Sequence, residues 1–178
     1  PAVFRFTGSA CEERHFKAAK AMGASFVIAI DWDNQTRMDL AKVLGADLVL
    51  GKNDNIVESI LSHTEGKGVD NSCEFSGSPA ALSNAIQSTR MGGYVNILSV
   101  YGNTLTEVPM NDIVFRYLHV KGINGRKMWA TWDKMHDLLN ADKIDINTLV
   151  THRINYLEYR NGIELTLSGE CGKVVMDF

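Results

Sequence analysis

The sequence predicts an α/β protein built on a doubly wound, parallel, six-stranded sheet, with a small α+β segment at the C-terminal end. Short apolar runs of strand length alternate with amphipathic runs of helix length, which is the pattern of successive βαβ units. An early strand, residues 26–30, is followed directly by Asp31, as in dinucleotide-binding units. Glycine, proline and serine mark the turns between the runs.

The first half of the chain is expected to supply three strands and three helices. The strands cover residues 2–6, 26–30 and 47–50, and the helices cover residues 12–22, 36–44 and 56–62. Gly45 follows the second helix, at a position where glycine adopts a left-handed terminal conformation at little cost. Helices between strands allow the strands to run parallel.

The second half repeats this alternation. The strands cover residues 69–75, 94–100 and 118–123, and the helices cover residues 79–88, 110–117 and 129–139. Ser78 can cap the helix over residues 79–88, and Pro79 suits its first turn. Gly92 and Gly93 predict a turn into the strand that begins at residue 94. Six strands with intervening helices predict the doubly wound sheet.

The last part of the chain changes character. Strands over residues 148–154 and 173–178 flank a helix over residues 157–168, and Gly169 and Gly172 interrupt the pattern. These two strands need not join the parallel sheet. We therefore expect a small separate segment at this end.

Composition excludes several classes of function. The net charge of −3 and the scattered Lys and Arg give no attraction to nucleic acid or to an anionic membrane. No apolar run reaches the roughly 18 residues that span a bilayer, and no signal peptide opens the sequence. Cys11, Cys73 and Cys171 are odd in number and widely spaced, so a reducing cytoplasm is expected. The opening at Pro1, just before a strand, indicates part of a longer protein, proteolytic or engineered.

Neither the histidines nor the serines indicate catalysis within this chain. The histidines are His15, His63, His119, His136 and His152. Their spacing matches no metal motif such as H-E-x-x-H, and packing or surface roles are favoured. Ser76 lacks the first glycine of a nucleophile elbow. We expect no catalytic residue and no metal ligand here.

Asp31 is the best single candidate for binding a ligand. An acid at the end of the second strand can accept hydrogen bonds from both hydroxyls of an adenosine ribose, and its charge repels a 2′-phosphate, which favours NAD over NADP. The alternative is a loop acid or helix cap, a role that Asp33 and Asn34 would serve equally well. Arg37 can lie over the adenine or can be a solvated helix residue.

The glycine fingerprint expected just upstream is missing. Where G-x-G-x-x-G should stand, residues 6–13 contain one glycine, Gly8, and two acids, Glu12 and Glu13. Gly8 and the amides of the following helix can still bind phosphate. The acids are better explained as first-turn residues that balance the helix dipole. Taken alone, this loop argues against tight dinucleotide binding.

Three other loops follow predicted strands. They cover residues 75–77, 98–102 and 122–126, and each is rich in Gly or Ser. Such residues are common in any tight turn. Because ligands of open α/β sheets bind at the carboxyl ends of the strands, the three loops together favour a ligand site.

Several motifs occur in the order seen in one enzyme family. They cover residues 19–24, 44–47, 66–70, 74–82, 122–129, 151–153 and 168–175. In this order they resemble the zinc-dependent medium-chain dehydrogenases, and most closely the members that oxidise threonine. The resemblance extends over about residues 17–178.

The resemblance implies an activity and cofactors. It implies NAD-dependent oxidation of the β-hydroxyl of L-threonine to 2-amino-3-oxobutanoate, with hydride transfer to NAD and a zinc ion that polarises the hydroxyl oxygen. The zinc ligands belong to an N-terminal half that this sequence does not contain, so the chain is expected to be inactive alone. The full-length enzyme would be a homo-oligomer, dimer or tetramer, paired near residues 118–123.

The resemblance also assigns domains and site residues. Residues 1–128 would form a Rossmann domain, and residues 129–178 would return to the catalytic domain, with His152 in a structural role. Asp31 and Arg37 would hold the adenosine end. The residues that would flank the cofactor are Phe75, Ser76, Gly77, Leu98 and Ser99, and those beside the nicotinamide are Ile123 and Asn124.

Two departures from the family keep alternatives open. The family's glycine loop falls on residues 7–12, which do not preserve it, and the turn between Asp31 and Arg37 is one residue longer, so Asp33 can compete for the ribose. One alternative is a non-catalytic interaction module of the same fold with weak or lost cofactor binding. Others are a related polyol or alcohol dehydrogenase, and an error in the sequence over residues 4–16.

Overall fold

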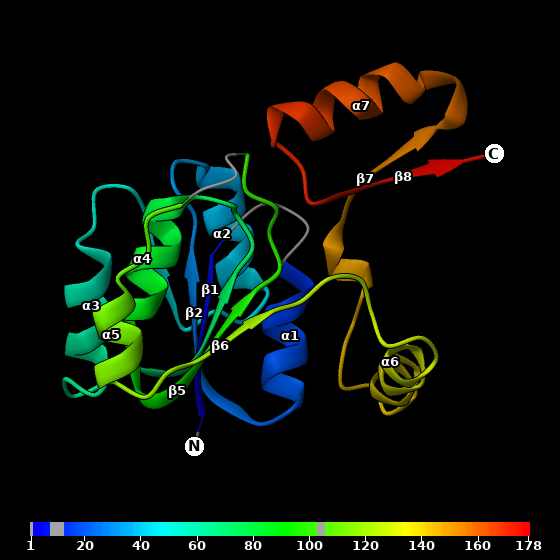
Figure 1. Cartoon of the computed structure of the whole chain (residues 1–178). Coiled ribbons are helices and arrows are strands. Elements are labelled where there is room, and N and C mark those ends of the chain that lie inside the picture. Colours follow the sequence, from blue (N-terminus) through cyan, green and yellow to red (C-terminus); the bar gives the residue numbers. More distant parts are fainter. Residues whose placement is uncertain (1, 8–12, 103–105) are drawn as a thin grey trace.

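A computed structural model of the chain describes residues 2–7, 13–102 and 106–178. The main body of this part is a parallel six-stranded sheet with the order β3-β2-β1-β4-β5-β6 (Figure 1). The strands are β1 (Ala2–Thr7), β2 (Ala24–Ile30), β3 (Leu48–Leu50), β4 (Val69–Glu74), β5 (Thr89–Ile97) and β6 (His119–Gly122). The order reverses between β1 and β4, so two βαβ halves meet there as in doubly wound folds.

Helices cover both faces of this sheet. They are α1 (Glu13–Ala21), α2 (Gln35–Val43), α3 (Ile56–His63), α4 (Pro79–Ser88) and α5 (Met110–Phe115). Strand β2 shows why both faces are covered, because its successive side chains point to opposite sides. Val27 and Ala29 pack in a buried cluster with α1 and α2, whereas Ile28 and Ile30 pack in another with α3. A third cluster joins α4 to β5.

The C-terminal part forms a second, separate sheet. Its elements are α6 (Ala130–Asn140), β7 (Val150–Asn155), α7 (Tyr159–Ser168) and β8 (Lys173–Asp177), with short 3-10 turns at Asn147–Leu149 and Tyr156–Glu158. Strands β7 and β8 pair in parallel, and α7 crosses between them. Gly162 lets α7 lie close to this sheet, because a Cβ atom there would lie 2.7 Å from Ile154 Cδ1. The expectation that these strands need not join the main sheet is confirmed.

Figure 1 shows α6 and the α7 segment projecting from the main sheet on the side of α1 and α2. Several contacts among the described residues attach this part to the main sheet and its helices. Lys17 Nζ donates a hydrogen bond of 2.6 Å to Thr148 Oγ1, and Leu149 is buried in the cluster with α1 and α2. Asn34 Nδ2 donates a hydrogen bond of 3.0 Å to the carbonyl oxygen of Gly169.

The predicted strand start at residue 94 is wrong, because β5 begins at Thr89 and includes Gly92 and Gly93, where a turn was predicted. Val69 pairs with Thr89 and Asn71 pairs with Tyr94, so residues 90–93 of β5 lie opposite the single residue Asp70 of β4 and form a bulge. Gly92 has φ +69, and a Cβ atom on Gly93 would lie 3.0 Å from the Asp70 carbonyl oxygen. The two glycines therefore lie in this bulge, and pairing with β4 resumes at Tyr94.

Other predicted boundaries differ by only a few residues. Strand β5 ends at Ile97, so Leu98 begins a loop, and α5 ends two residues before Tyr117, which has a positive φ of 52°. A tyrosine in this left-handed conformation does not continue a helix. The predicted positions of the other elements agree with the observed helices and strands to within one to three residues.

Candidate cofactor-binding site

The pairing register brings the ends of five strands into one row across the main sheet. Thr7 lies opposite Ile30 on one side and Glu74 on the other. Glu74 in turn pairs with Ile97, and Ile97 pairs with Gly122. Neighbouring strands lie about 4.8 Å apart, so the row spans roughly 19 Å. Beyond it lies the carboxyl edge, where ligands of open α/β sheets bind.

Predicted site residues stand just beyond this row. Asp31, Phe75, Leu98 and Ile123 are each the first residue after their strand. The other predicted residues in these loops are Ser76, Gly77, Ser99 and Asn124. Gly8 follows β1 but lies outside the described residues. The structure thus brings predicted residues from four loops to one edge of the sheet.

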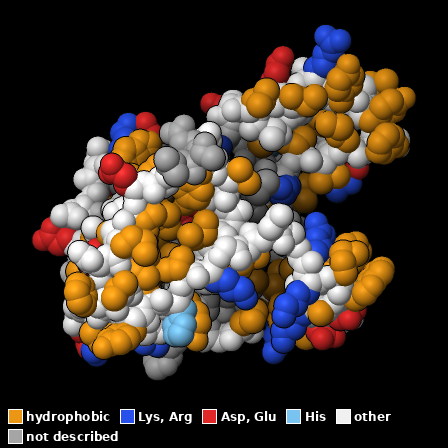
Figure 2. All heavy atoms as spheres, viewed as in Figure 1, with side chains coloured by type: hydrophobic (Ala, Val, Ile, Leu, Met, Phe, Trp, Pro, Cys, Tyr) orange, Lys and Arg blue, Asp and Glu red, His pale blue; other side chains and the backbone are white. Residues whose placement is uncertain are grey.

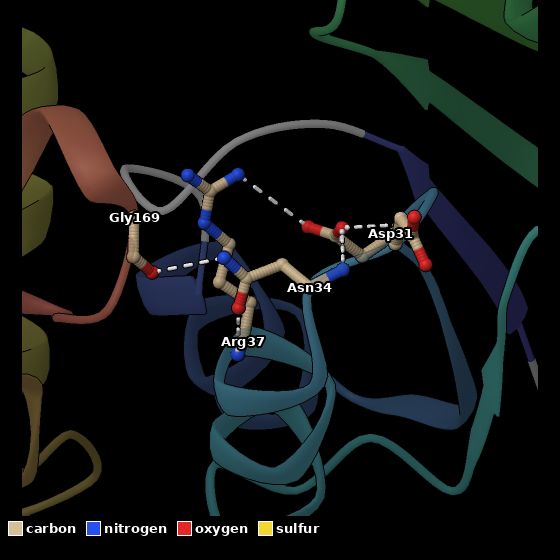
Figure 3. A network of polar contacts seen from close by, with 5 residues as sticks. Asp31, Asn34, Arg37 and Gly169 are labelled. Atoms are coloured by element: carbon tan, nitrogen blue, oxygen red, sulfur yellow. Dashed lines mark hydrogen bonds and ion pairs between the residues drawn. The ribbon is translucent and has the colours of Figure 1, made fainter.

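The Asp31 carboxylate turns toward its own loop (Figure 3). Its Oδ1 accepts hydrogen bonds from the backbone N–H groups of Asp33 at 3.3 Å and Asn34 at 3.2 Å. Its Oδ2 lies 3.7 Å from Arg37 Nη1, and the Asp31 side chain is 15% exposed. Asp31 therefore stabilises the turn into α2, while the cap of α2 is Asn34, whose Oδ1 accepts from the backbone N–H of Arg37. The partial exposure leaves the carboxylate accessible to a ligand.

Arg37 is not an ordinary solvated helix residue. Its side chain is 24% exposed, and its Nε is buried with no hydrogen-bond partner in the part of the chain that the structure describes. The C-terminal segment contributes to this burial, since Gly169 lies so close that a Cβ atom there would collide with the guanidinium. A buried N–H without a hydrogen-bond partner is a costly feature.

Asp33, the competing acid, has a different partner. Its carboxylate forms an ion pair with the Lys52 ammonium, beyond the end of β3. Its side chain is 61% exposed, compared with 15% for that of Asp31. The two acids of the long turn are therefore directed toward different cations, and Asp31 is the one that faces Arg37.

Glu74, which sequence reasoning missed as a site residue, organises two of the predicted loops. It is the last residue of β4 and is fully buried. Its Oε1 accepts from the backbone N–H and hydroxyl of Ser76, and its Oε2 accepts from the N–H of Gly77 at 3.3 Å. The same Oε2 accepts from the Ser99 hydroxyl and, at 2.7 Å, from the Tyr101 hydroxyl. The signal in the sequence was an acid that ends a strand before Ser and Gly.

This network fixes the charge of its members. Burial raises the pKa of Glu74, but the bonds from Ser76, Ser99 and Tyr101 outweigh it and leave the pKa below its ordinary value. Burial, together with the bond to Glu74, raises the pKa of the Tyr101 hydroxyl to about 12. Glu74 is consequently an anion near neutral pH, and Tyr101 keeps the proton that it donates.

Phe75 packs into the protein rather than standing free at the edge. Its ring stacks on His15 with centroids 4.8 Å apart and on Phe6 at 6.2 Å. Close to His15, a hollow of about 500 Å³ lies between α1 and α6. Its lining comprises His15, Ala18, Arg126, Thr131, Trp132, Met135, His136 and Leu139. The stacking of Phe75 on His15 and Phe6 holds the start of the β4 loop against α1.

The loops after β5 and β6 continue the sheet by one bond each. The N–H of Leu98 donates to the carbonyl oxygen of Glu74 at 2.9 Å, and the N–H of Ile123 donates to that of Ile97 at 2.8 Å. The Leu98 side chain is 37% exposed, and Asn124 is exposed. The apolar side chain after each strand can therefore line a surface at the far end of the row from Asp31.

Comparison with known proteins identifies the family. Residues 15–141 match the family model described as zinc-binding dehydrogenase, and this stretch is more than half of the chain. This chain belongs to the zinc-binding dehydrogenases.

Individual relatives of this zinc-binding dehydrogenase agree with the family model. An L-threonine 3-dehydrogenase of Bacillus licheniformis is 41% identical over 89% of the chain and 46% of its own length. The crystal structure of 2R,3R-butanediol dehydrogenase from Bacillus subtilis is 28% identical, with a TM-score of 0.88 over 99% of the chain and 51% of its own length. A short chain alcohol dehydrogenase from E. coli CFT073, solved with the cofactor NADH, shares the fold at 18% identity, with a TM-score of 0.85. The chain thus spans about half the length of these relatives.

The described residues of this zinc-binding dehydrogenase do not fit a zinc centre. Among them, no three side chains of His, Cys, Asp or Glu are grouped so that they could hold a metal ion. Structural and catalytic zinc sites require three or four such ligands. No chemistry of these residues is therefore assigned to zinc.

No helix in the described part of the chain has the length and apolar character needed to cross a membrane.

Proposed function

We propose that the chain is the NAD-binding portion of an enzyme that oxidises L-threonine to 2-amino-3-oxobutanoate and transfers the hydride to NAD. The observation that carries the proposal is the row of strand ends, from Ile30 to Gly122, with predicted cofactor residues just beyond it. The identity to L-threonine 3-dehydrogenases supports the substrate. The relative solved with NADH supports the cofactor.

The residues at the two ends of the row have different roles in this proposal. Asp31 would bind the adenosine ribose, and Arg37, whose Nε is unsatisfied, would lie beside the adenosine. The negative charge of Asp31 disfavours a 2′-phosphate, so the site should prefer NAD to NADP. Ile123 and Asn124, after β6, would lie beside the nicotinamide. The loops between them would flank the cofactor, through Phe75, Ser76, Gly77, Leu98 and Ser99. NAD, when bound, accepts the hydride.

The proposed division into domains places residues 1–128 in the dinucleotide-binding domain and residues 129–178 in a segment that returns to the catalytic domain. The separate sheet of β7 and β8 supports it. Large apolar side chains are exposed on this segment, including Trp129, Leu157 and Leu167, which are 68%, 72% and 81% exposed. Figure 2 shows apolar side chains gathered over α6 and at the outer end of α7. In the proposal, the remaining half of the enzyme covers them and supplies the zinc ligands.

We further propose that the whole enzyme is a dimer or tetramer paired through β6. This strand is at the edge of the main sheet and is exposed throughout. Val120 within β6 and Phe115 and Tyr117 just before it are 42%, 72% and 73% exposed. An exposed strand edge with apolar neighbours favours pairing with another chain.

Calorimetry with NAD tests the central claim. We expect micromolar binding by the 178-residue chain, and a loss of about tenfold or more for Asp31→Ala, because hydrogen bonds to a charged group are lost. Absence of binding at millimolar NAD would instead favour a non-catalytic interaction module. With threonine and NAD, the chain alone should form no NADH, even with added zinc. Turnover by it would contradict the assignment of the catalytic centre to the other half.

A related alcohol or polyol dehydrogenase is the second candidate, favoured by the structural similarity to butanediol dehydrogenase. The substrate panel that separates the two candidates is run on the enzyme with both halves present. Threonine should give the highest kcat/KM. A diol that exceeds threonine would select the alternative and leave NAD binding by this chain unaffected.

A further inference from the structure

We propose that Glu74 is a positioning residue of the cofactor site, which ties the loop after β4 to the loop after β5 and so holds both against NAD. The inference rests on the proposed function, since it assigns a role at the same edge of the sheet. Glu74 itself is buried and would not touch the cofactor.

One oxygen of the carboxylate serves the β4 loop, and the other serves both loops. Oε1 binds Ser76 of the β4 loop through its N–H at 2.7 Å and its hydroxyl. Oε2 binds the hydroxyls of Ser99 and Tyr101 of the β5 loop, and also the N–H of Gly77. Glu74 is therefore the point at which two loops, separated by α4 and β5 in the chain, are joined.

The joined loops are packed without space between them. A Cβ atom on Gly77 would lie 2.6 Å from the carbonyl oxygen of Val100, and Gly77 has φ +72. The two loops thus approach backbone to backbone at a residue that must be glycine. A change at Glu74 that lets either loop move would alter the surface that both present at the carboxyl edge.

The chemistry of the five contacts requires a carboxylate. All the groups around Glu74 act as donors, and two of them, the N–H groups of Ser76 and Gly77, cannot rotate to become acceptors. In glutamine an NH2 group replaces one of the two oxygens, and it faces a backbone N–H, that of Ser76 or that of Gly77, whichever way the amide turns. Within the described residues, no ion pair links Glu74 to a cation, so the arrangement depends on these neutral donors.

The test compares Glu74→Gln with Asp47→Asn in the 178-residue chain. Asp47 also accepts from a backbone N–H, that of Val27 at 2.6 Å, but lies at the opposite, amino end of β3. NAD binding is measured well below the thermal unfolding midpoint of each variant. We expect Glu74→Gln to weaken NAD binding about tenfold. Asp47→Asn should lower the free energy of unfolding, while its Kd for NAD stays within about twofold of that of the unchanged chain. Hydrogen exchange should rise at the amides of Ser76 and Gly77 only in Glu74→Gln.

A second variant keeps the proposal testable if Glu74→Gln does not fold. Ser99→Ala combined with Tyr101→Phe removes the donors of the β5 loop but leaves the carboxylate and its bonds to Ser76. It should weaken NAD binding severalfold.

The outcomes separate this inference from the proposed function. Suppose that the unchanged chain binds NAD, and that Glu74→Gln or the double variant folds, binds NAD equally well and shows unchanged hydrogen exchange. The role of Glu74 is then refuted, while the NAD-binding function stands. If the unchanged chain does not bind NAD, the proposed function fails first, and the positioning role fails with it.

Discussion

Replacing Gly169 by alanine tests whether the C-terminal segment supports Asp31 and Arg37, the residues proposed to bind the adenosine. Gly169 ends α7 in a left-handed conformation, with φ +75. An added Cβ atom would collide with the Arg37 guanidinium and lie 2.9 Å from Asn34 Nδ2. The substitution therefore strains the backbone and displaces two side chains that surround Asp31.

The magnitude follows from three contributions. The left-handed backbone costs about 1–2 kcal/mol for alanine. Loss of the hydrogen bond from Asn34 to the Gly169 carbonyl, 3.0 Å long, costs about 1 kcal/mol. Separation of Asp31 and Arg37, now 3.7 Å apart and partly exposed, costs up to about 1 kcal/mol. The free energy of unfolding should fall by roughly 2–4 kcal/mol.

Gly45 provides the matched control, because it has φ +99 and no atom within 4 Å of an added Cβ. Gly45→Ala should show the backbone strain alone, about 1–2 kcal/mol. In urea unfolding, with a slope of about 2 kcal/mol per molar, the midpoint should fall by roughly 1–2 M for Gly169→Ala and 0.5–1 M for Gly45→Ala. NAD affinity should fall only for Gly169→Ala. Equal midpoints and unchanged affinity would refute the reasoning.

Three further predictions test the edge of the sheet. Gly77→Ala should lower stability by at least about 2 kcal/mol in urea unfolding and weaken NAD binding, because its Cβ atom would press on Val100; full affinity would contradict the packing of the loops. In the folded chain the pKa of Glu74 lies below its ordinary value of 4.5, so the ionised side chain stabilises the fold fully above pH 4.5 and loses this effect as the pH falls through the lowered pKa. The difference in unfolding temperature between the unchanged chain and Glu74→Gln should therefore narrow only in that acidic range. Asp33→Asn should change the Kd for NAD less than twofold while Asp31→Asn raises it about tenfold, and the reverse ranking by calorimetry would assign the ribose to Asp33.

Local pattern in the sequence was sufficient to predict most elements of the fold. Alternation between strand and helix patterns located them, because burial on one or both faces dictates which positions are apolar. It also placed Asp31, Phe75, Leu98 and Ile123 at strand ends. That these residues share one edge follows from parallel pairing, which any sheet of βαβ units must adopt.

Features that depend on neighbours distant in the sequence could not be predicted in this way. Gly92 and Gly93 have the composition of a turn, and only their pairing opposite β4 makes them a bulge inside a strand. Glu74 resembles any polar residue at the end of a strand, and its role depends on the donors Ser99 and Tyr101, which reach it only after folding. The ribose role of Asp31 stays a prediction.

The contact between Gly169 and the N-terminus of α2 has a thermodynamic consequence. Asn34 and Arg37 meet the C-terminal segment on one side and Asp31 on the other, so under the proposed function they would take part both in holding this segment and in binding the nucleotide (Figure 3). Where one set of side chains takes part in two events, the free energies are coupled, and the coupling is the same in both directions. If the packed C-terminal segment makes nucleotide binding more favourable by holding Arg37 in place, a bound nucleotide makes the packing of that segment more favourable by the same free energy. The orientation of the sheet of β7 and β8 would then depend on whether the cofactor is bound, although this sheet does not contact the cofactor.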